Sequence, residues 1–313
     1  MHRTVHVGAV LCSAALVACA KDQSSADSTT GSTTDAGAAV AERVGETAGF
    51  NVPESVRYDA ELDVFYVSNV NGNPSQKDNN GFIARVRADS TGVMTILVEG
   101  GKRGIFLNAP KGMALSGDTL FVADIDMLRK FNRRTGEYFG AVSLREQKAT
   151  FLNDLTVAPD GIYITDTGIV FDAKGGMTHP GVNRIFKVVG MTVTEAATGD
   201  SLLNPNGIAW DASGNRFILA PFGGPQVQSW VPGQSPATLA TGPGGYDGVE
   251  MASDGRIFVS SWADSAVHVI RNGRISRLVS NVPAPADIGI DTKRNVLAIP
   301  RFNDGKVEYY RIP

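Results

Sequence analysis

The feature that most constrains the fold is an internal repeat that recurs six times between about residue 50 and the C-terminus. Each copy begins near a polar residue, continues with alternating apolar positions, turns at a pair such as Asp-Gly or Ser-Gly, and returns as a second β-rich run. The copies start 57, 42, 53, 41 and 39 residues apart, at Glu54, Lys111, Asn153, Asn206, Asp247 and Ala286. Steps near 40 residues are typical of one four-stranded propeller blade.

The repeat predicts an all-β protein, a six-bladed β-propeller with four-stranded blades. The last copy ends with residues 306–311 as a third strand, so closing the ring requires a fourth strand from residues 40–44 or 47–52, which also removes an exposed edge. Two copies are lengthened by insertions at residues 69–81 and 168–182. Helical periodicity is absent from the repeats, which disfavours a helical or α/β fold.

The N-terminus has the pattern of an export signal. Arg3 precedes an apolar run at residues 7–17 that is too short to span a bilayer, and Leu16-Val17-Ala18-Cys19 follows. These four residues resemble a bacterial lipobox, whose cysteine becomes the lipidated first residue. We therefore expect a signal peptide at 1–18, a flexible tether at 19–48 that is poor in large apolar residues, and a propeller at 49–313. The expected location is the bacterial cell envelope, on the periplasmic or surface side, with membrane contact through the Cys19 anchor only.

Composition excludes several classes of function. The 29 Lys and Arg residues against 32 Asp and Glu residues give a net charge of −3, so no basic field favours nucleic acid as a partner. Only His179 and His268 lie beyond the export signal, which excludes sites built from several imidazoles. A nucleophile elbow, a phosphate-binding loop and a His-Glu-x-x-His motif are all missing.

Propeller topology indicates where a site would lie. The inner strand of each blade lines the central channel, so the six starting residues face one another at one mouth. Four of them carry oxygen donors suited to a divalent cation, and calcium fits better than zinc: Glu54, Asn153, Asn206 and Asp247. Asn-Gly, Asn-Asp and Asp-Gly are also common turn pairs, so each residue taken singly has a structural explanation. Four donors at equivalent repeat positions favour a metal site.

Further candidates surround this mouth. The residues predicted to contact a substrate are Lys111, Asp154, Asp166, Trp262 and Arg301. The ends of the second strands also place Asn69, Asp124 and Phe222 there. Lys111 could instead balance the acidic ring. His179 lies in the second insertion, where it could carry a proton or be inert, and His268 alternates within a strand.

The donor set resembles the gluconolactonase family, also called regucalcin or senescence-marker-protein-like. The resemblance covers about residues 50–313 and rests on residues 151–154, 204–207 and 246–248. It implies one divalent ion in the channel, often calcium, hydrolysis of a lactone or related ester, and Asp247 as the candidate base. Members that hydrolyse sugar lactones commonly have an arginine where this chain has Phe151, so a more apolar lactone or ester is an equal candidate.

Two other readings compete with this one. A propeller can keep a calcium ion for stability and use its mouth to bind a ligand or a protein, because fold alone does not determine function. A resemblance to arylesterases of the paraoxonase kind would require two channel ions and a catalytic histidine, for which the sequence offers no matching residue. The leading prediction is a divalent-metal-dependent hydrolase, with calcium the most suitable ion, whose partner is a small lactone or ester.

Overall fold

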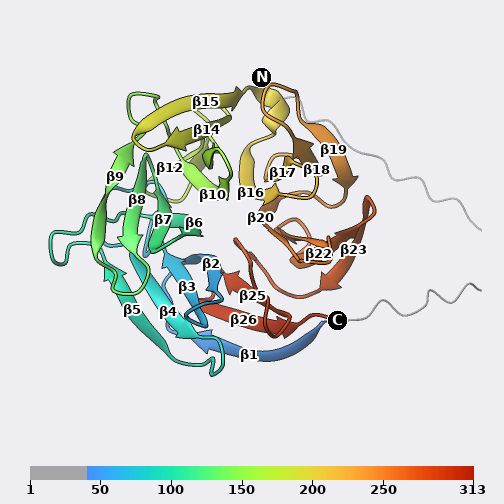
Figure 1. Ribbon diagram of the computed structural model, residues 1–313, viewed down its shortest axis with the longest axis horizontal. Helices are drawn as coiled ribbons and strands as arrows, with labels where there is room; N and C mark the ends of the chain where they lie inside the picture. Colours follow the sequence, from blue (N-terminus) through green and yellow to red (C-terminus); the bar gives the residue numbers. More distant parts are fainter. Residues whose placement is uncertain (1–40) are drawn as a thin grey trace, which may run out of the picture. The chain divides into compact units, whose positions relative to one another are not determined.

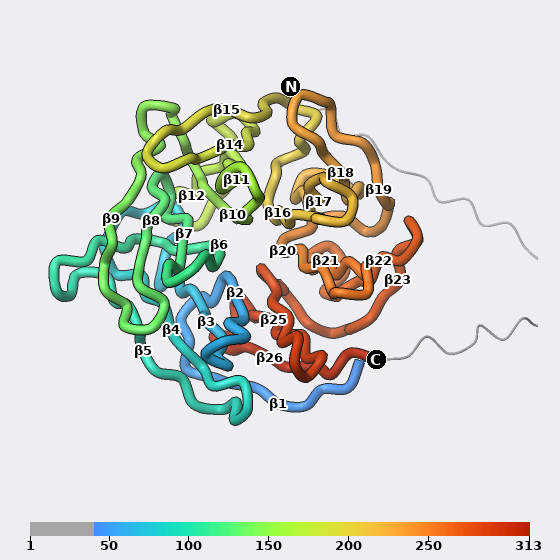
Figure 2. Tube along the Cα trace, in the orientation of Figure 1, coloured from blue at the N-terminus to red at the C-terminus, as the bar shows by residue number. Residues whose placement is uncertain are grey.

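The computed structural model describes residues 41–313 and confirms the six-bladed β-propeller (Figures 1 and 2). Six four-stranded antiparallel sheets surround a common axis, and the chain passes around the ring from blade to blade. The predicted signal peptide, the lipidation residue Cys19 and most of the predicted tether lie outside the described residues.

Each blade starts at the channel and adds its strands outward. Blade 1 contains β2 (Pro53–Asp59), β3 (Val64–Asn69), β4 (Phe82–Arg87) and β5 (Met94–Glu99). Blade 2 contains β6 (Pro110–Ser116), β7 (Thr119–Asp124), β8 (Met127–Asn132) and β9 (Tyr138–Ser143). Blade 3 contains β10 (Leu152–Ala158), β11 (Gly161–Asp166), β14 (Arg184–Val189) and β15 (Thr192–Thr198). Its insertion forms a small hairpin of β12 (Val170–Phe171) and β13 (Met177–Thr178).

The remaining blades repeat this order. Blade 4 contains β16 (Pro205–Asp211), β17 (Arg216–Pro221), β18 (Gln226–Trp230) and β19 (Ala237–Thr241). Blade 5 contains β20 (Tyr246–Met251), β21 (Ile257–Ser261), β22 (Ala266–Arg271) and β23 (Arg274–Val279). Blade 6 contains β24 (Gly289–Asp291), β25 (Val296–Arg301) and β26 (Lys306–Arg311).

The N-terminal strand β1 (Glu42–Ala48) closes the ring by pairing antiparallel with β26, as the sequence predicts. Figure 1 shows β1 along the outside of blade 6, where it supplies the fourth strand. The propeller therefore begins at Glu42 and not at residue 49, and residues 42–48, expected in the tether, belong to blade 6. The closing strand was expected at residues 40–44 or 47–52, and it spans the residues between these alternatives as well. Its side chains face mostly solvent, so its sequence lacks the apolar pattern that would have fixed these bounds.

The hydrophobic core is divided among the blade interfaces. Six clusters of buried side chains each join two neighbouring blades, for example Tyr163 of blade 3 against Phe217 and Trp230 of blade 4. Successive side chains of a strand point to opposite faces of its blade, so the buried strands near the channel, such as β3 and β25, pack one set of side chains against each neighbouring blade. The polar residues at the start of the inner strands therefore line the mouth of the channel.

A β-bulge re-aims the side chains at the start of five inner strands. Pairing with the second strand shifts register at 53–56, 110–113, 152–155, 205–207 and 246–249. Bulges commonly re-aim side chains next to functional sites. The inner strands also approach closely, since a Cβ on Gly207 would lie 2.4 Å from the Asp247 carbonyl oxygen. A side chain at this position would push blades 4 and 5 apart.

Helical structure within residues 41–313 is limited to one 3₁₀ turn at Asp200–Leu202. No helix in this part of the chain is long and apolar enough to cross a membrane.

Candidate active site

A cavity of about 500 Å³ opens at the channel mouth where the inner strands start. Its base includes all four predicted metal ligands, one from each of β2, β10, β16 and β20. Lys111 and Trp262, two of the predicted substrate-contacting residues, also line it. The repeat alignment therefore brought together residues that are up to 193 positions apart in the chain, Glu54 and Asp247.

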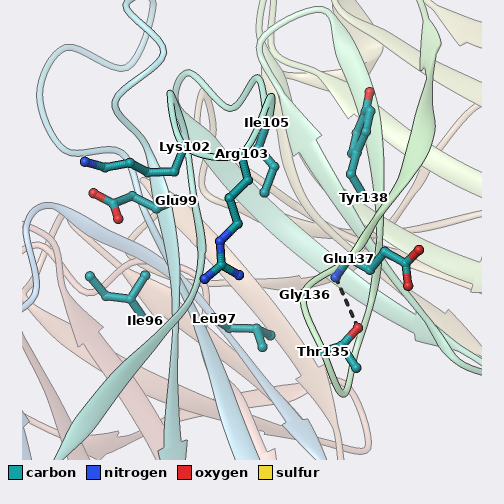
Figure 3. A pocket seen from close by; sticks show the side chains of 10 residues that line it. All are labelled: Ile96, Leu97, Glu99, Lys102, Arg103, Ile105, Thr135, Gly136, Glu137 and Tyr138. Atoms are coloured by element: carbon teal, nitrogen blue, oxygen red, sulfur yellow. Dashed lines mark hydrogen bonds between the residues drawn. The ribbon is translucent and has the colours of Figure 1, made fainter.

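A second hollow, of about 720 Å³, lies away from the channel between blades 1 and 2 (Figure 3). It is bordered by the edge strand β5, the loop that follows it and the turn between β8 and β9. Figure 3 shows long side chains such as Lys102, Arg103 and Glu137, which are exposed. A surface hollow with exposed charges holds no convergent buried polar groups, so the smaller channel cavity is the candidate site.

The four donor residues are buried but their hydrogen bonding is incomplete. Glu54, Asn153, Asn206 and Asp247 are each 4–6 % exposed. Glu54 Oε2 and Asp247 Oδ1 have no hydrogen-bond partner. Asp247 Oδ2 accepts a 2.8 Å hydrogen bond from Trp262 Nε1, and Asn153 Nδ2 donates to Thr167 Oγ1 at 3.0 Å, which leaves the Asn153 carbonyl oxygen available. Buried carboxylate oxygens without a partner are costly unless something satisfies them.

Electrostatics in the cavity favour a bound cation. Burial, followed by the charge of Asp287, raises the pKa of Asp247 to about 8, although hydrogen bonds from Trp262 and Asn206 oppose the shift. Burial also raises the pKa of Glu54 well above its usual range, and the charges of Asp247 and Asp287 add to this effect while Lys111 opposes it. Two carboxyl and two amide oxygens of this kind fit a hard divalent cation such as calcium.

Histidine, cysteine and a third carboxylate do not contribute to this donor set. Within residues 41–313, no group of three or more His, Cys, Asp or Glu side chains is arranged to bind a metal ion. The candidate site therefore depends on Asn153 and Asn206 as well as on its two acids. His179 Nε2 lies 3.0 Å from the Thr167 carbonyl and 2.9 Å from Asn183 Oδ1, and His268 pairs with Asp264. Neither histidine lines the cavity.

Lys111 is 1 % exposed and lies beside the donors. Its Nζ donates to the carbonyl oxygens of Pro74 and Ala109, both at 3.0 Å, and lies 4.1 Å from the centre of the Phe151 ring. Burial lowers its pKa to about 8 even though Glu54 acts in the opposite direction. The positive charge of Lys111 thus partly compensates the negative charge of Glu54, and its hydrogen bond to the Pro74 carbonyl fixes the first insertion, residues 69–81.

Three predicted substrate contacts lie outside the cavity lining, namely Asp154, Asp166 and Arg301. Their polar atoms form hydrogen bonds within the protein. Asp154 accepts hydrogen bonds from the amides of Leu155 (2.7 Å) and Ile208 (2.8 Å). Asp166 accepts from the amides of Phe151 (2.7 Å) and Thr150 (3.1 Å). Each carboxylate therefore fixes backbone near an inner strand.

Arg301 likewise serves the scaffold, donating to Glu308 (2.9 Å) and to the Pro283 carbonyl (3.1 Å). Asn69 and Asp124, also placed at the mouth by the sequence, bind the backbone that enters β2 and β6.

The predicted mouth residues that line the cavity and those that do not differ in position by one residue along the second strand of each blade. Asn69, Asp124, Asp166 and Arg301 are the last residues of their strands, whereas Phe222 and Trp262 are the first residues after theirs. Successive side chains point to opposite sides, so a one-residue shift exchanges the cavity for the scaffold. The position after the strand holds Val70, Ile125, Thr167, Phe222, Trp262 and Phe302, and all but Ile125 line the cavity.

A second group of titratable residues lies further along the channel, and only Asp154 among them was singled out in the sequence. Arg57 pairs with Glu250, with Asp287 at 3.3 Å and with Asp154 at 3.8 Å. Asp287 also accepts a 2.5 Å hydrogen bond from Ser55 Oγ. Arg57 and Glu250 each lie three residues after a predicted ligand, so aligning the repeats beyond their first residue would have revealed this group.

The fold and this cavity define a six-bladed β-propeller with a buried acidic donor set at one mouth of its channel. Among solved structures, the chain is similar to a calcium-binding protein, regucalcin, from Agrobacterium tumefaciens strain C58, with 16 % identity, a TM-score of 0.66, and coverage of 88 % of this chain and 96 % of that one. It is also similar to a luciferin-regenerating enzyme, with 14 % identity, a TM-score of 0.63, and coverage of 87 % of this chain and 94 % of that one. A putative gluconolactonase matches with 17 % identity, a TM-score of 0.62, and coverage of 87 % of this chain and 91 % of that one.

No protein-family model matches the chain, and no curated protein matches its sequence. At these identities the structural similarity establishes the fold, and the activity has to be argued from the site.

Proposed function

We propose that the protein is a divalent-metal-dependent hydrolase of a lactone or a related ester. Glu54, Asn153, Asn206 and Asp247 would hold the ion, most suitably calcium. The observation that carries the proposal is the pair of buried carboxylates with unpaired oxygens beside two amides in one cavity. The likeness in fold to a calcium-binding regucalcin and to a putative gluconolactonase supports it.

The residues of the chain have distinct parts in this reaction. When bound, a divalent ion polarises the carbonyl of the substrate and stabilises negative charge on its oxygen. Asp247 is the proposed general base, and it must be ionised to act. Its Oδ2 is fixed by Trp262, and its Oδ1 has no hydrogen bond to lose. Because a carboxylate oxygen has about two acceptor sites, Oδ1 can contact an ion and still accept a proton.

The proposed step balances as an ordinary hydrolysis. Asp247 Oδ1 takes one proton from a water molecule as the water oxygen bonds to the carbonyl carbon. The ring or ester C–O bond then breaks, and the leaving oxygen takes the proton back from Asp247. The products are a hydroxy acid from a lactone, or an acid and an alcohol from an ester, and the base is regenerated.

A hydrolysis screen with calcium, manganese or zinc, in the presence and absence of a chelator, tests the activity. Asp247→Asn keeps an oxygen ligand but removes the base, so kcat should fall by roughly 10²–10⁴-fold and excess metal should not restore it. Glu54→Gln keeps an oxygen and spares the base, so high metal should largely restore turnover by mass action. Asp89→Asn, at an exposed residue of blade 1, is the control.

If excess metal restores both variants equally, Asp247 is a ligand only. If metal stabilises the fold but no lactone or ester is hydrolysed, the ion is structural and the propeller is a binding module.

We also propose that the protein is exported and anchored to the cell envelope through a lipid on Cys19. The Leu-Val-Ala-Cys sequence supports this proposal. Replacement of the cysteine, Cys19→Ser, should release the protein from the membrane fraction of cells. Unchanged membrane retention would contradict the anchor.

A further inference from the structure

The two insertions that lengthen blades 1 and 3 meet above the cavity. The amide of Phe171 donates to Ser75 Oγ at 3.0 Å, and Asn73 Nδ2 donates to the Asp172 carbonyl at 2.6 Å. Lys111 holds the first insertion at the Pro74 carbonyl from below. These contacts fix the insertions into one wall, to which Val70, Pro74, Ile169, Phe171 and Met177 contribute apolar side chains.

The rest of the wall is aromatic. Phe222, Trp262 and Phe302 follow the second strands of blades 4, 5 and 6, and their rings form a continuous arc. The ring centres of Phe222 and Trp262 are 5.9 Å apart, and those of Trp262 and Phe302 are 5.5 Å apart. Phe151 also lines the cavity and packs on the insertion wall, since its ring centre is 5.8 Å from that of Phe171. Contacts at these separations are ordinary aromatic packing.

Most hydrogen-bonding capacity of the polar lining groups above the donors is already used. Thr167 Oγ1 accepts from Asn153 and donates to the Pro205 carbonyl at 2.8 Å. Trp262 Nε1 donates to Asp247, and Lys111 Nζ uses two of its three N–H groups on carbonyl oxygens. Asn303, at the exposed edge, is the remaining polar side chain of the lining. A substrate with several hydroxyl groups would lose most of its hydrogen bonds to water here without replacement.

Building on the proposed function, we infer that the substrate is an apolar lactone or ester and not a polyhydroxylated sugar lactone. Its carbonyl lies at the donors, and an alkyl or aryl group of several carbons lies against the apolar wall. The two insertions thus act as specificity elements, because they supply half of that wall. The cavity volume of about 500 Å³ falls within the range of ordinary small-molecule sites.

A matched series of six-membered lactones tests this inference in the metal-loaded protein. The series contains δ-valerolactone, δ-decalactone, which adds a pentyl group, and D-glucono-1,5-lactone, which adds hydroxyl groups. Full burial of a methylene group gives about fourfold in affinity. Partial burial of the pentyl group should raise kcat/KM at least about tenfold over δ-valerolactone, with the sugar lactone the poorest of the three. A sugar lactone that matches or exceeds δ-decalactone would overturn the inference while leaving the hydrolase intact.

Substitutions in the wall should change the preference, which a purely structural role would not. Phe171→Ala and Phe302→Ala should lower the ratio of kcat/KM for δ-decalactone to that for δ-valerolactone by about three- to tenfold, and Phe171→Leu should recover most of it. Phe106→Ala is the matched control, because Phe106 is 62 % exposed and lies outside the cavity lining. Equal losses on both substrates would mean that the aromatic side chains support the fold only.

Binding measured without turnover separates this inference from the proposed reaction. The probes are δ-valerolactam and its 6-pentyl derivative, since a lactam resists hydrolysis. Calorimetry should show at least tenfold tighter binding of the pentyl lactam and loss of that preference in Phe171→Ala. This result would support the apolar site even if no lactone were hydrolysed. Equal binding of the two lactams, or no binding of either, would reject it.

Discussion

The same inner strands carry two charged tiers that are neutralised differently. In β2 and β20, Glu54 and Asp247 lie near the mouth, and Arg57 and Glu250 lie three residues further along, about 10 Å at the usual strand rise. The deeper tier contains its own cation, the guanidinium of Arg57, among Glu250, Asp287 and Asp154. Asp287 Oδ1 in the deeper tier also lacks a hydrogen-bond partner, but that carboxylate is paired with Arg57. In the mouth tier, Glu54 Oε2 and Asp247 Oδ1 have no hydrogen-bond partner within residues 41–313, and neither carboxylate forms a salt bridge with an arginine of this part of the chain.

This contrast separates structural acids from candidate ligands. A buried carboxylate needs a counter-charge, and the deeper tier obtains it from within the chain. Lys111 supplies part of the counter-charge at the mouth, but its Nζ donates to two carbonyls and not to Glu54. Burial and acidic neighbours therefore raise the pKa of Glu54 and of Asp247. An external cation is the remaining way to stabilise both in ionised form.

The largest expected effect is on the deeper tier. Arg57→Ala leaves the buried carboxyl groups of Asp154 and Asp287 and the partly buried one of Glu250 without their cation. The free energy of unfolding should therefore fall by about 3–5 kcal/mol, measured by urea denaturation. Arg87→Ala is the control, because that arginine pairs with Asp89 at 2.6 Å while its side chain is 72 % exposed. Its loss should produce no measurable change. If the two variants are equally stable, Arg57 is not the internal counter-ion.

The mouth tier should respond to an ion from solution. Adding calcium to chelated protein at about 100 times its Kd should raise the free energy of unfolding by about 2.7 kcal/mol. Asn206→Ala removes a proposed ligand and should reduce this rise at the same calcium concentration. Asn303→Ala, on the exposed edge of the same cavity, should retain the full rise. A wild-type protein whose stability does not change with calcium, manganese or zinc would show that the unpaired oxygens are not a cation site.

Glu54→Gln should lower stability only when the ion is present. In chelated protein it removes a buried carboxyl group that lacks a full counter-charge, so stability should stay equal or rise by about 1–2 kcal/mol. In calcium it weakens the site, so the ion-dependent gain should shrink. Glu137→Gln, at an exposed residue of the outer hollow, should show neither effect. A loss of stability in chelated protein would mean that groups within the chain stabilise the ionised Glu54, as Arg57 does for the deeper carboxylates.

The repeat predicted the ring, its closure and the convergence of the four proposed ligands on one cavity, because each depends on period and topology, which sequence displays. Their role as metal ligands stays a prediction. The positions after the second strands were predicted correctly at Phe222 and Trp262 and one residue early at Arg301, because sequence alone does not fix the last paired residue of a strand. The bulges at 53–56 and 246–249 depend on how two strands pair. The deeper tier was missed because Arg57 and Glu250 resemble solvent-facing strand residues until the ring is closed.

The smallest expected effect concerns pH at the deeper tier. Burial raises the pKa of Glu250 to about 7, and Asp287 adds to the shift although Arg57 opposes it. Because the ordinary value is about 4.3, the folded protein binds more protons at this residue than the unfolded chain does between the two values. Its contribution to stability therefore falls as pH rises through that window, by on the order of 1 kcal/mol between pH 6 and 7. Glutamine does not titrate, so in calcium-saturated protein Glu250→Gln should flatten the stability curve by that amount relative to wild type. Parallel curves would show that Arg57 keeps Glu250 fully ionised, and the two tiers would then differ more sharply than burial alone implies.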